Sequence, residues 1–477
     1  MSTAVSKLKE KLYSSKEPLK NFFEGSLYPA LVAVFTLVGH ISGLEFYINI
    51  VNMLAVCVAL LVCTSFKPIL PFMLTVIFQV NIKHSPGIPT WSSYYFETPK
   101  LIILAILVAL LVGSLVYFII KNTVPKIRRD AFRKLPLFPS VIILAAAFLL
   151  NGLFSSEWRP SSLIYGFIQA FIYSVFFYII YYGFEDEDVS ALLDSLSYIA
   201  ALVAAVLIGE MIFMFLTYDS IFANGSLVKE EINLGWGIWN PIGFCLTVTI
   251  PMQMRGAMKL KYPFVYLTSA LLTWIFAILT LSRNALIFAS LAIAASMIIA
   301  CFVGERKRLF RIITAVGVLL AVAAVALLWD KISTTLIDLI NRGFSDNGRY
   351  ELWSIGINNF LSAPVFGTGF FGYGETDVFM VATFIPTLAH NTLVEMLSAA
   401  GIVGILAYLY YRASTAILFI KNFSYEKLML LLPILLTLGM SLIDNFVFHF
   451  YTSFWYLICL AVVCKMNKEQ QKEMDSE

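Results

Sequence analysis

Apolar segments about as long as a lipid bilayer is thick recur along nearly the whole chain. A membrane-spanning helix needs roughly 20 mainly apolar residues, and fourteen segments are candidates for such spans. They begin near Leu27, Phe46, Pro68, Leu101, Leu135, Leu163, Ala191, Trp236, Pro263, Asn284, Ile312, Asn391, Leu428 and Val447. The third segment and the last pair, which divides around His449, are the weakest, so twelve or thirteen spans are alternatives. A cleaved signal peptide does not explain the pattern, because the apolar segments continue far beyond the amino end.

The composition is that of a chain whose main solvent is lipid. Hydrophobic residues make up 60% of the 477 and charged residues only 13%, whereas ordinary soluble domains are about 25% charged. We therefore expect an all-α polytopic membrane protein. All six cysteines lie in apolar runs, and no disulfide framework or metal-ligand spacing is evident. The net charge of +3 gives no indication of nucleic-acid binding.

Lys and Arg are distributed unevenly between the loops. Cytoplasmic segments of membrane proteins are enriched in these residues. With the amino terminus inside, the inner segments hold 25 of the 33 Lys and Arg, and eight lie outside. This bias predicts a multi-pass protein of the cytoplasmic membrane with both termini in the cytoplasm.

The same orientation predicts how the chain is divided. We expect a cytoplasmic segment (1–24), eleven spans (25–329), an extracytoplasmic loop (330–388), three further spans (389–464) and a cytoplasmic tail (465–477). The long outer loop contains Pro364 and a run of glycines that includes Gly367 and Gly369. Glycine and proline favour irregular turns, so this loop should carry only short helices.

Three arginines among the outer cations are candidate anion-binding residues: Arg283, Arg342 and Arg349. Arg283 opens an apolar run, where a charge costs roughly 2.5–3.5 kcal/mol to insert. Arg349 starts a predicted helix and shares a face with Trp353, four residues later. A guanidinium is planar, permanently charged and able to grip phosphate oxygens with two hydrogen bonds. The alternatives are an arginine that snorkels to the headgroups and a surface contact between arginine and an aromatic ring.

His390 is the histidine best placed to act as a base, because it follows the long outer loop and precedes a strong apolar helix. We expect Thr387 to cap that helix and His390 to lie in its first turn, where the helix dipole disfavours the charged imidazole. A structural histidine is the alternative. Asp444, His449 and Glu210 are further candidates, because ionisable groups within membrane segments are often functional, although they could also pair with an arginine.

Several of these residues together resemble the O-antigen ligase and O-antigen polymerase family. The resemblance covers about residues 271–410 and rests on the order of short pieces rather than on one motif. The pieces are Ser282-Arg283 at the start of a span, Gly348-Arg349 with Trp353, the loop of Pro364, Gly367 and Gly369, then His390-Asn391, and Gly401 with Gly404 in the next helix. No metalloprotease, nucleotide-binding or serine-hydrolase motif is present, so we expect chemistry without a metal or another cofactor.

The resemblance implies a membrane-embedded glycosyltransferase of the GT-C type. Such an enzyme takes a glycan from an undecaprenyl-diphosphate donor and transfers it, with inversion, to a glycan or lipid-linked acceptor. Arg283 and Arg349 would hold the diphosphate, and His390 would take the proton of the acceptor hydroxyl. Arg342, Trp353 and Asn391 would also line the substrate site. The amino-terminal half, which matches no motif, would choose the acceptor.

Three functions remain open at this point. The first is a polymerase of capsule, exopolysaccharide or O-antigen repeat units. The second is a ligase that moves finished glycan to lipid A-core or another surface acceptor. The third is a transporter or flippase of lipid-linked sugars. Four aromatic residues of the outer loops, namely Trp91, Tyr94, Tyr95 and Trp158, are candidates for stacking on sugars, with anchoring at the membrane interface as the alternative.

Overall fold

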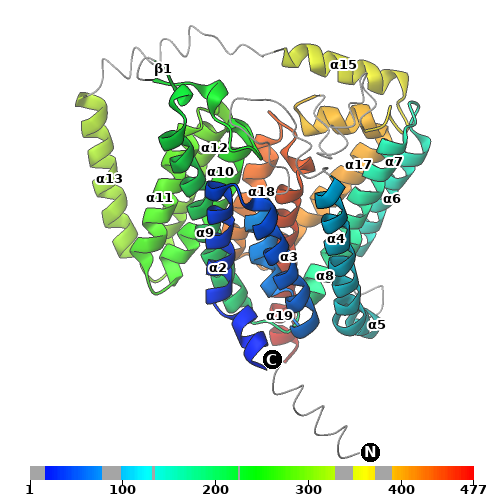
Figure 1. The fold of residues 1–477 in the computed structure, drawn as a ribbon, viewed down its shortest axis with the longest axis horizontal. Coiled ribbons are helices and arrows are strands. Elements are labelled where there is room, and N and C mark those ends of the chain that lie inside the picture. Colours follow the sequence, from blue (N-terminus) through cyan, green and yellow to red (C-terminus); the bar gives the residue numbers. More distant parts are fainter. Residues whose placement is uncertain are drawn as a thin grey trace, which may run out of the picture.

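The computed structural model describes residues 17–77, 98–130, 135–223, 226–327, 348–370 and 389–476. These residues form a bundle of helices (Figure 1). Within them, the regular strands are one short antiparallel pair, β1 (Phe222–Ala223) and β2 (Ser226–Leu227). The prediction of an all-α fold is confirmed.

The long helices are connected by short loops and by brief 3₁₀ or π turns, labelled η. In chain order the elements are α2 (Leu27–Ser42), α3 (Glu45–Val62), η1 (Lys67–Ile69), η2 (Phe72–Val76), α4 (Thr98–Phe118), η5 (Ile119–Thr123), α5 (Val124–Asp130), α6 (Phe138–Phe154), α7 (Pro160–Phe171), η7 (Ile172–Phe176), α8 (Phe177–Gly183), α9 (Val189–Thr217), η8 (Asp219–Ile221), η9 (Lys229–Glu231), α10 (Trp239–Lys259), α11 (Pro263–Leu279), α12 (Arg283–Phe302), α13 (Lys307–Leu327), α15 (Arg349–Ser362), α17 (Thr392–Ile420), α18 (Tyr425–Met440), η10 (Phe446–Phe448) and α19 (Phe450–Ser476).

Many of these helices are suited to cross a membrane. Among the described residues, seven helices are long and apolar enough to do so, and the bent pair Glu17–Glu24 and Leu27–Ser42 adds an eighth if it is one span. Three shorter apolar helices accompany them: Lys67–Val76, Phe138–Phe154 and Pro263–Leu279. The chain is therefore a polytopic membrane protein. The count of fourteen spans stays a prediction, and the weak third candidate near Pro68 is a short, irregular helix.

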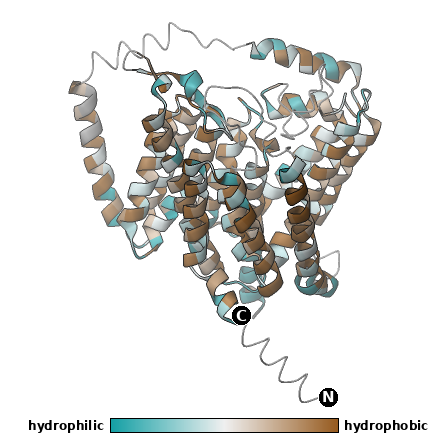
Figure 2. Ribbon diagram, in the orientation of Figure 1, coloured by the Kyte–Doolittle hydropathy of each residue, from teal (hydrophilic) through white to brown (hydrophobic). Residues whose placement is uncertain are grey.

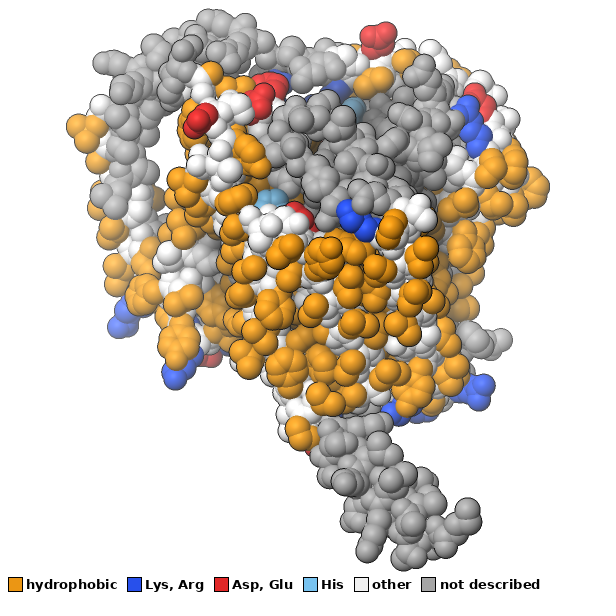
Figure 3. Space-filling view, in the orientation of Figure 1, with side chains coloured by type: hydrophobic (Ala, Val, Ile, Leu, Met, Phe, Trp, Pro, Cys, Tyr) orange, Lys and Arg blue, Asp and Glu red, His pale blue; other side chains and the backbone are white. Residues whose placement is uncertain are grey.

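The outer surface of the bundle is apolar, as contact with lipid requires. Figure 2 shows hydrophobic ribbon through the middle of the molecule, and Figure 3 shows a broad band of hydrophobic side chains with charged side chains mostly toward its two ends. On α4, for example, Leu101, Ile106 and Val112 are 44%, 56% and 52% exposed. Exposing this surface to water would cost a free energy of about 25 cal/mol per Å² of apolar area. Hydrocarbon is the solvent that this surface fits.

Helix α10 lies at the centre of the bundle and connects its parts. It packs against α9, α11, α12 and α18, and the side chains from Ile242 to Met258 are all buried. Its first residues, by contrast, are partly exposed and reach the end of the bundle where α12 also begins. Packing of α10 therefore holds Asn240, near its start, beside the ends of α12 and α18.

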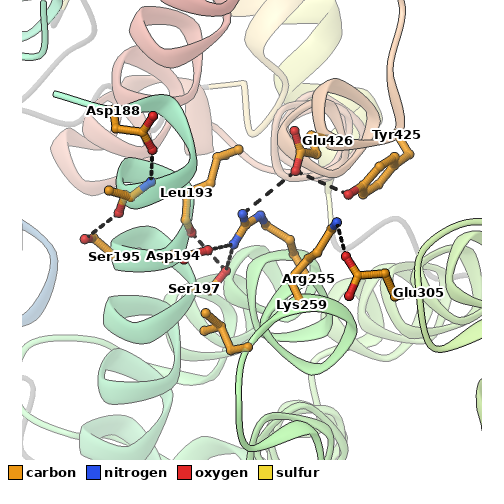
Figure 4. A network of polar contacts seen from close by, with 12 residues as sticks. Asp188, Leu193, Asp194, Ser195, Ser197, Arg255, Lys259, Glu305, Tyr425 and Glu426 are labelled. Atoms are coloured by element: carbon orange, nitrogen blue, oxygen red, sulfur yellow. Dashed lines mark hydrogen bonds and ion pairs between the residues drawn. The ribbon is translucent and has the colours of Figure 1, made fainter.

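At its other end, α10 is held by a buried arginine. Arg255 is 1% exposed, and its Nη1 donates to Asp194 of α9 at 2.7 Å and to Ser197 at 3.3 Å. Its Nη2 lies 3.9 Å from Glu426 of α18 (Figure 4). A buried charge is tolerated when it is paired and hydrogen-bonded. Arg255 thus ties α9, α10 and α18 together at the end of the bundle opposite α15.

Helix α17 is broken at Gly401, whose φ of 60° and ψ of −160° interrupt the helical backbone. The segment 364–369, which follows α15, pairs with the break. Ile402 N donates to Pro364 O at 2.8 Å, and further main-chain bonds join this segment to residues just before Gly401. Main-chain groups shielded from water must find such partners. The Pro364 loop and Gly401 therefore form one contact that docks α15 on α17.

Replacing Gly401 by alanine is expected to destabilise the protein strongly. Its backbone conformation is one that only glycine adopts readily, and a Cβ there would lie 2.5 Å from Val365 O. Gly43 is a matched control, because its φ is also positive, at 68°, but nothing lies within 4 Å of its Cβ position. We expect Gly43→Ala to cost about 1–2 kcal/mol and Gly401→Ala clearly more. Thermal denaturation in detergent measures the difference, and equal melting temperatures for the two variants would contradict this account of the break.

Candidate functional site

Four helices begin at the same end of the bundle: α10, α12, α15 and α17 (Figure 1). The first turn of a helix has main-chain N–H groups without helical partners, and the aligned peptide dipoles make this end positive. Each of these helices also carries a polar or charged residue at or just before its start, namely Asn240, Arg283, Arg349 and His390. This end of the bundle is therefore suited to an anion.

Arg283 is the first residue of α12, and the turn before it fixes its position. Leu281 adopts a left-handed φ of 55°, which reverses the chain between α11 and α12. Ser282 caps α12 by accepting a hydrogen bond from Ala285 N at 3.3 Å. The Ser282 hydroxyl also donates to Asn240 Oδ1 at 2.7 Å. The start of α12 is thus tied to the start of α10, and the Arg283 side chain is exposed at the surface of this end.

Asp444 joins the start of α10 to His390. It lies in the loop between α18 and η10, where its Oδ2 accepts a hydrogen bond from Asn240 Nδ2 at 3.3 Å. Its Oδ1 lies 3.1 Å from His390 Nδ1. The His390 side chain is 40% exposed and that of Asp444 only 16%. The histidine therefore presents an accessible ring, while its carboxylate partner lies behind it.

The environment keeps Asp444 ionised. Burial raises the pKa of Asp444, but the hydrogen bond and charge of His390, the charge of His449 and the Asn445 main-chain N–H lower it, and the net result is below the ordinary value. An ionised carboxylate can only accept hydrogen bonds. A neutral imidazole beside it would carry its hydrogen on Nδ1, facing Asp444, and this would leave Nε2 free to accept a proton.

His390 precedes α17 rather than lying in its first turn, so the prediction of a cap at Thr387 is wrong. Asn391 is the cap, and its Oδ1 accepts hydrogen bonds from Leu393 N at 3.0 Å and Val394 N at 3.2 Å. Its Nδ2 donates to Leu442 O at 3.0 Å. Asparagine is one of the residue types that cap the start of a helix most effectively. Both ends of the Asn391 amide are thus engaged within the protein.

The main chain of Ala389, the residue before His390, is held by hydrogen bonds from two helices. Trp353 of α15 donates its indole N–H to Ala389 O at 2.8 Å, and Glu395 of α17 accepts from Ala389 N at 3.0 Å. Trp353 lies one turn after Arg349, the first residue of α15. The same short helix therefore carries a candidate anion-binding arginine and holds the main chain that presents His390.

Lys229, which the sequence did not single out, belongs to this end of the bundle as well. Its Nζ lies 5.1 Å from the centre of the Trp239 ring, at the start of α10. Partial burial lowers the pKa of Lys229, and the positive charges of Arg283 and Arg349 lower it further, against the opposing charge of Glu230. Both arginines are therefore close enough to repel the Lys229 ammonium.

Comparison with protein families adds an independent finding. Residues 268–409 match the family model described as O-antigen ligase. This segment is therefore similar to the O-antigen ligase family. The match confirms the resemblance that the sequence predicts, and it supports a membrane enzyme that transfers glycans. No curated protein matches the chain.

The matched segment, residues 268–409, contains only part of the site. Arg283, Arg349 and His390 lie within it. Asn240 and Lys229 come from before it and Asp444 from after it, and they reach the site through α10 and the loop after α18. The sequence identified Asp444 as a candidate without its partner. It offered no signal for Lys229 beyond its place among the outer cations, and none for Asn240, which lies just inside the span predicted to begin near Trp236.

The remaining candidates lie elsewhere or outside the described residues. Arg342, Thr387, Trp91, Tyr94 and Tyr95 belong to segments that the structure does not describe. Trp158, in the turn between α6 and α7, is 52% exposed. In a separate cluster, Glu210 of α9 accepts a hydrogen bond from Trp236 Nε1 at 2.9 Å and lies 3.9 Å from His40. Within the described part of the chain, no three His, Cys, Asp or Glu side chains are grouped as metal ligands would be.

Proposed function

We propose that the protein is a glycosyltransferase that joins undecaprenyl-diphosphate-linked glycans, and that it acts as a repeat-unit polymerase. The observation that carries this proposal is the His390–Asp444 pair beside Arg283, where α10, α12, α15 and α17 all begin. One accessible base and a cluster of fixed positive charge meet at a single end of the bundle. The O-antigen ligase family of residues 268–409 supports the same reaction class.

The proposed reaction moves a glycan from one oxygen to another. The acceptor hydroxyl oxygen attacks the anomeric carbon of the donor, and the bond between that carbon and the diphosphate oxygen breaks on the opposite face. The electron pair stays on the diphosphate, and the hydroxyl proton passes to His390 Nε2. Attack opposite the leaving group inverts the anomeric configuration. No metal or other cofactor is required for any of these steps, because the protein supplies both the positive charge and the base.

The two parts of the site would contribute in different ways. Positive groups aimed at the charge that develops on the diphosphate lower the barrier, and removal of one such donor in other enzymes costs about 10²–10³ in rate. A positioned base contributes typically 10²–10⁴. Asp444 would hold the His390 ring in the productive tautomer and stabilise it once it is protonated, without touching the substrate.

The location follows from the charge distribution. The Lys and Arg bias predicts that the termini are in the cytoplasm, and α19 ends at the opposite end of the bundle from the site. The site would therefore face the outside of a bacterial cytoplasmic membrane, where lipid-linked glycans are joined. Arg342, Trp353 and Asn391 remain proposed substrate contacts, although Trp353 and Asn391 already hold the main chain around His390.

The transporter alternative is less well supported. Broken helices in transporters expose main-chain groups to the substrate near the middle of the membrane. In α17 those groups are bonded to residues 364–369 instead. The ligase alternative shares the whole site and differs from the polymerase only in its acceptor.

One reconstitution separates the two enzymatic alternatives. The purified protein is placed in lipid nanodiscs with undecaprenyl-diphosphate repeat units as the sole substrate. A polymerase produces a ladder of glycan lengths and releases undecaprenyl diphosphate, and this is the expected result. A ligase releases undecaprenyl diphosphate only after a separate acceptor, such as lipid A-core, is added. If the wild type resembles the His390→Ala protein under both conditions, the proposed reaction is wrong.

A further inference from the structure

We propose that Lys229 is the third cation of the donor site, and that it makes the site selective for a diphosphate over a monophosphate. This inference rests on the proposed function and names one more residue of the same site. Lys229 lies outside the matched segment 268–409. It is therefore a contribution of this chain's own outer loop.

A folded loop holds Lys229 in place. Strands β1 and β2 pair just before it, and Val228 N donates to Ile221 O at 2.8 Å. Lys229 then starts the short 3₁₀ turn η9. Further along, the Trp236 indole is bonded to the fully buried Glu210. The loop is thus fastened on both sides of Lys229, so the main chain that carries this residue is held at a defined place.

The ammonium is next to the parts of the site already described. It lies over the ring of Trp239. Asn240, the residue after Trp239, is hydrogen-bonded to Ser282, which precedes Arg283. Asn240 is also hydrogen-bonded to Asp444, the partner of His390. The positive charges of Arg283 and Arg349 also lower the pKa of Lys229, as nearby cations do. Among the described residues, none accepts a hydrogen bond from Lys229 Nζ. Its N–H groups are therefore available to a ligand.

The charge of the ligand explains why a third cation is useful. A sugar linked through a diphosphate carries about two negative charges, and the departing polyprenyl diphosphate carries nearly three, because its terminal phosphate has a second pKa near 6. A monophosphate donor would carry and release about one charge fewer. Two arginines match the bound donor, whereas the additional charge of Lys229 matches the group that leaves. Lys229 should therefore affect turnover as well as binding.

Binding of two soluble probes tests the selectivity. Farnesyl diphosphate and farnesyl monophosphate are titrated against the full-length wild type, Lys229→Ala and Lys229→Arg in detergent. We expect the wild type to prefer the diphosphate, and Lys229→Ala to lose about tenfold in diphosphate affinity, as for a lost charge-assisted hydrogen bond. Monophosphate binding should change little, and Lys229→Arg should restore the preference. An unchanged preference in Lys229→Ala would overturn the inference.

A matched lysine controls for general effects of charge. Lys261 also lies over an aromatic ring, with its Nζ 5.2 Å from the centre of Tyr262, but it follows the far end of α10. That position is about 30 Å from Lys229 along the helix axis. Lys261→Ala should bind both probes like the wild type. An equal loss in Lys261→Ala would show that the effect of Lys229→Ala is not local.

Glycan transfer measured on the same proteins separates this inference from the proposed function. If the wild type joins glycans and Lys229→Ala has the same kcat and probe preference, Lys229 is not in the donor site and the proposed function stands. If the wild type neither joins glycans nor binds farnesyl diphosphate, the proposed function is wrong, and the proposed role of Lys229 is wrong as well. The expected result is a kcat about tenfold or more below that of the wild type in Lys229→Ala, with recovery in Lys229→Arg.

Discussion

Replacing His390 by alanine is expected to slow glycan transfer by about 10²–10⁴, because in the proposed reaction the acceptor hydroxyl loses its proton acceptor. The fold should survive, since the His390 ring is 40% exposed and contacts Asp444 at the surface of the bundle. The measurement is the initial rate of undecaprenyl diphosphate release in nanodiscs, normalised to the amount of folded protein. A rate within about threefold of the wild type would show that His390 is not the base.

Two further variants sharpen this result. In Asp444→Asn the new amide can donate to His390 Nδ1, which would move the ring hydrogen to Nε2 and block proton acceptance. We therefore expect a loss similar to that of His390→Ala. His40→Gln is the matched control, because His40 lies in the separate cluster with Glu210 and should retain transfer. Equal loss in His40→Gln would indicate a general disturbance of the bundle.

Arg283→Ala and Arg349→Ala are each expected to lower kcat by about 10²–10³, because in the proposed site each removes a positive group that stabilises the leaving diphosphate. Lysine at either position should recover only part of the rate, since an ammonium keeps the charge but not the planar pair of donors. Turnover of undecaprenyl-diphosphate glycans by the four single variants measures these effects.

Another arginine serves as a control for charge alone. Arg159 is also one of the predicted outer cations, but it lies at the start of α7, away from the starts of α10 and α12. Arg159→Ala should transfer glycans at nearly the wild-type rate. Wild-type rates in both Arg283→Ala and Arg349→Ala would remove the diphosphate site from this end of the bundle.

Much of the fold could be predicted because few main-chain conformations are possible for an apolar chain in lipid. A segment in hydrocarbon must satisfy its own main-chain hydrogen bonds, and a helix does this locally. The predicted starts at Leu27, Pro263 and Asn284 accordingly agree within one residue with α2, α11 and α12. Near Pro68 the described part of the candidate span consists of two short, irregular turns, because Pro68 and Pro71 interrupt the regular helix there. The rest of that candidate, from residue 78 on, lies outside the described residues.

The candidate site was predictable only where its residues mark the start of a helix. Arg283 and Arg349 each begin a helix, and the segment that carries them matches the O-antigen ligase family. The pairing of His390 with Asp444 was not predictable, because 54 residues separate them. The break at Gly401 was also hidden, since the apolar pattern of α17 continues through it.

The sequence alone determined that this protein is a bundle of apolar helices with arginines and a histidine at helix starts, because hydrophobicity and local main-chain bonding act over a few neighbouring residues. The tertiary structure alone decided which of those starts meet, which carboxylate contacts the histidine, and which lysine lies near the arginines. These features depend on contacts between segments that are far apart in the chain. The contacts arise from packing around α10 and from the docking of residues 364–369 into the break of α17.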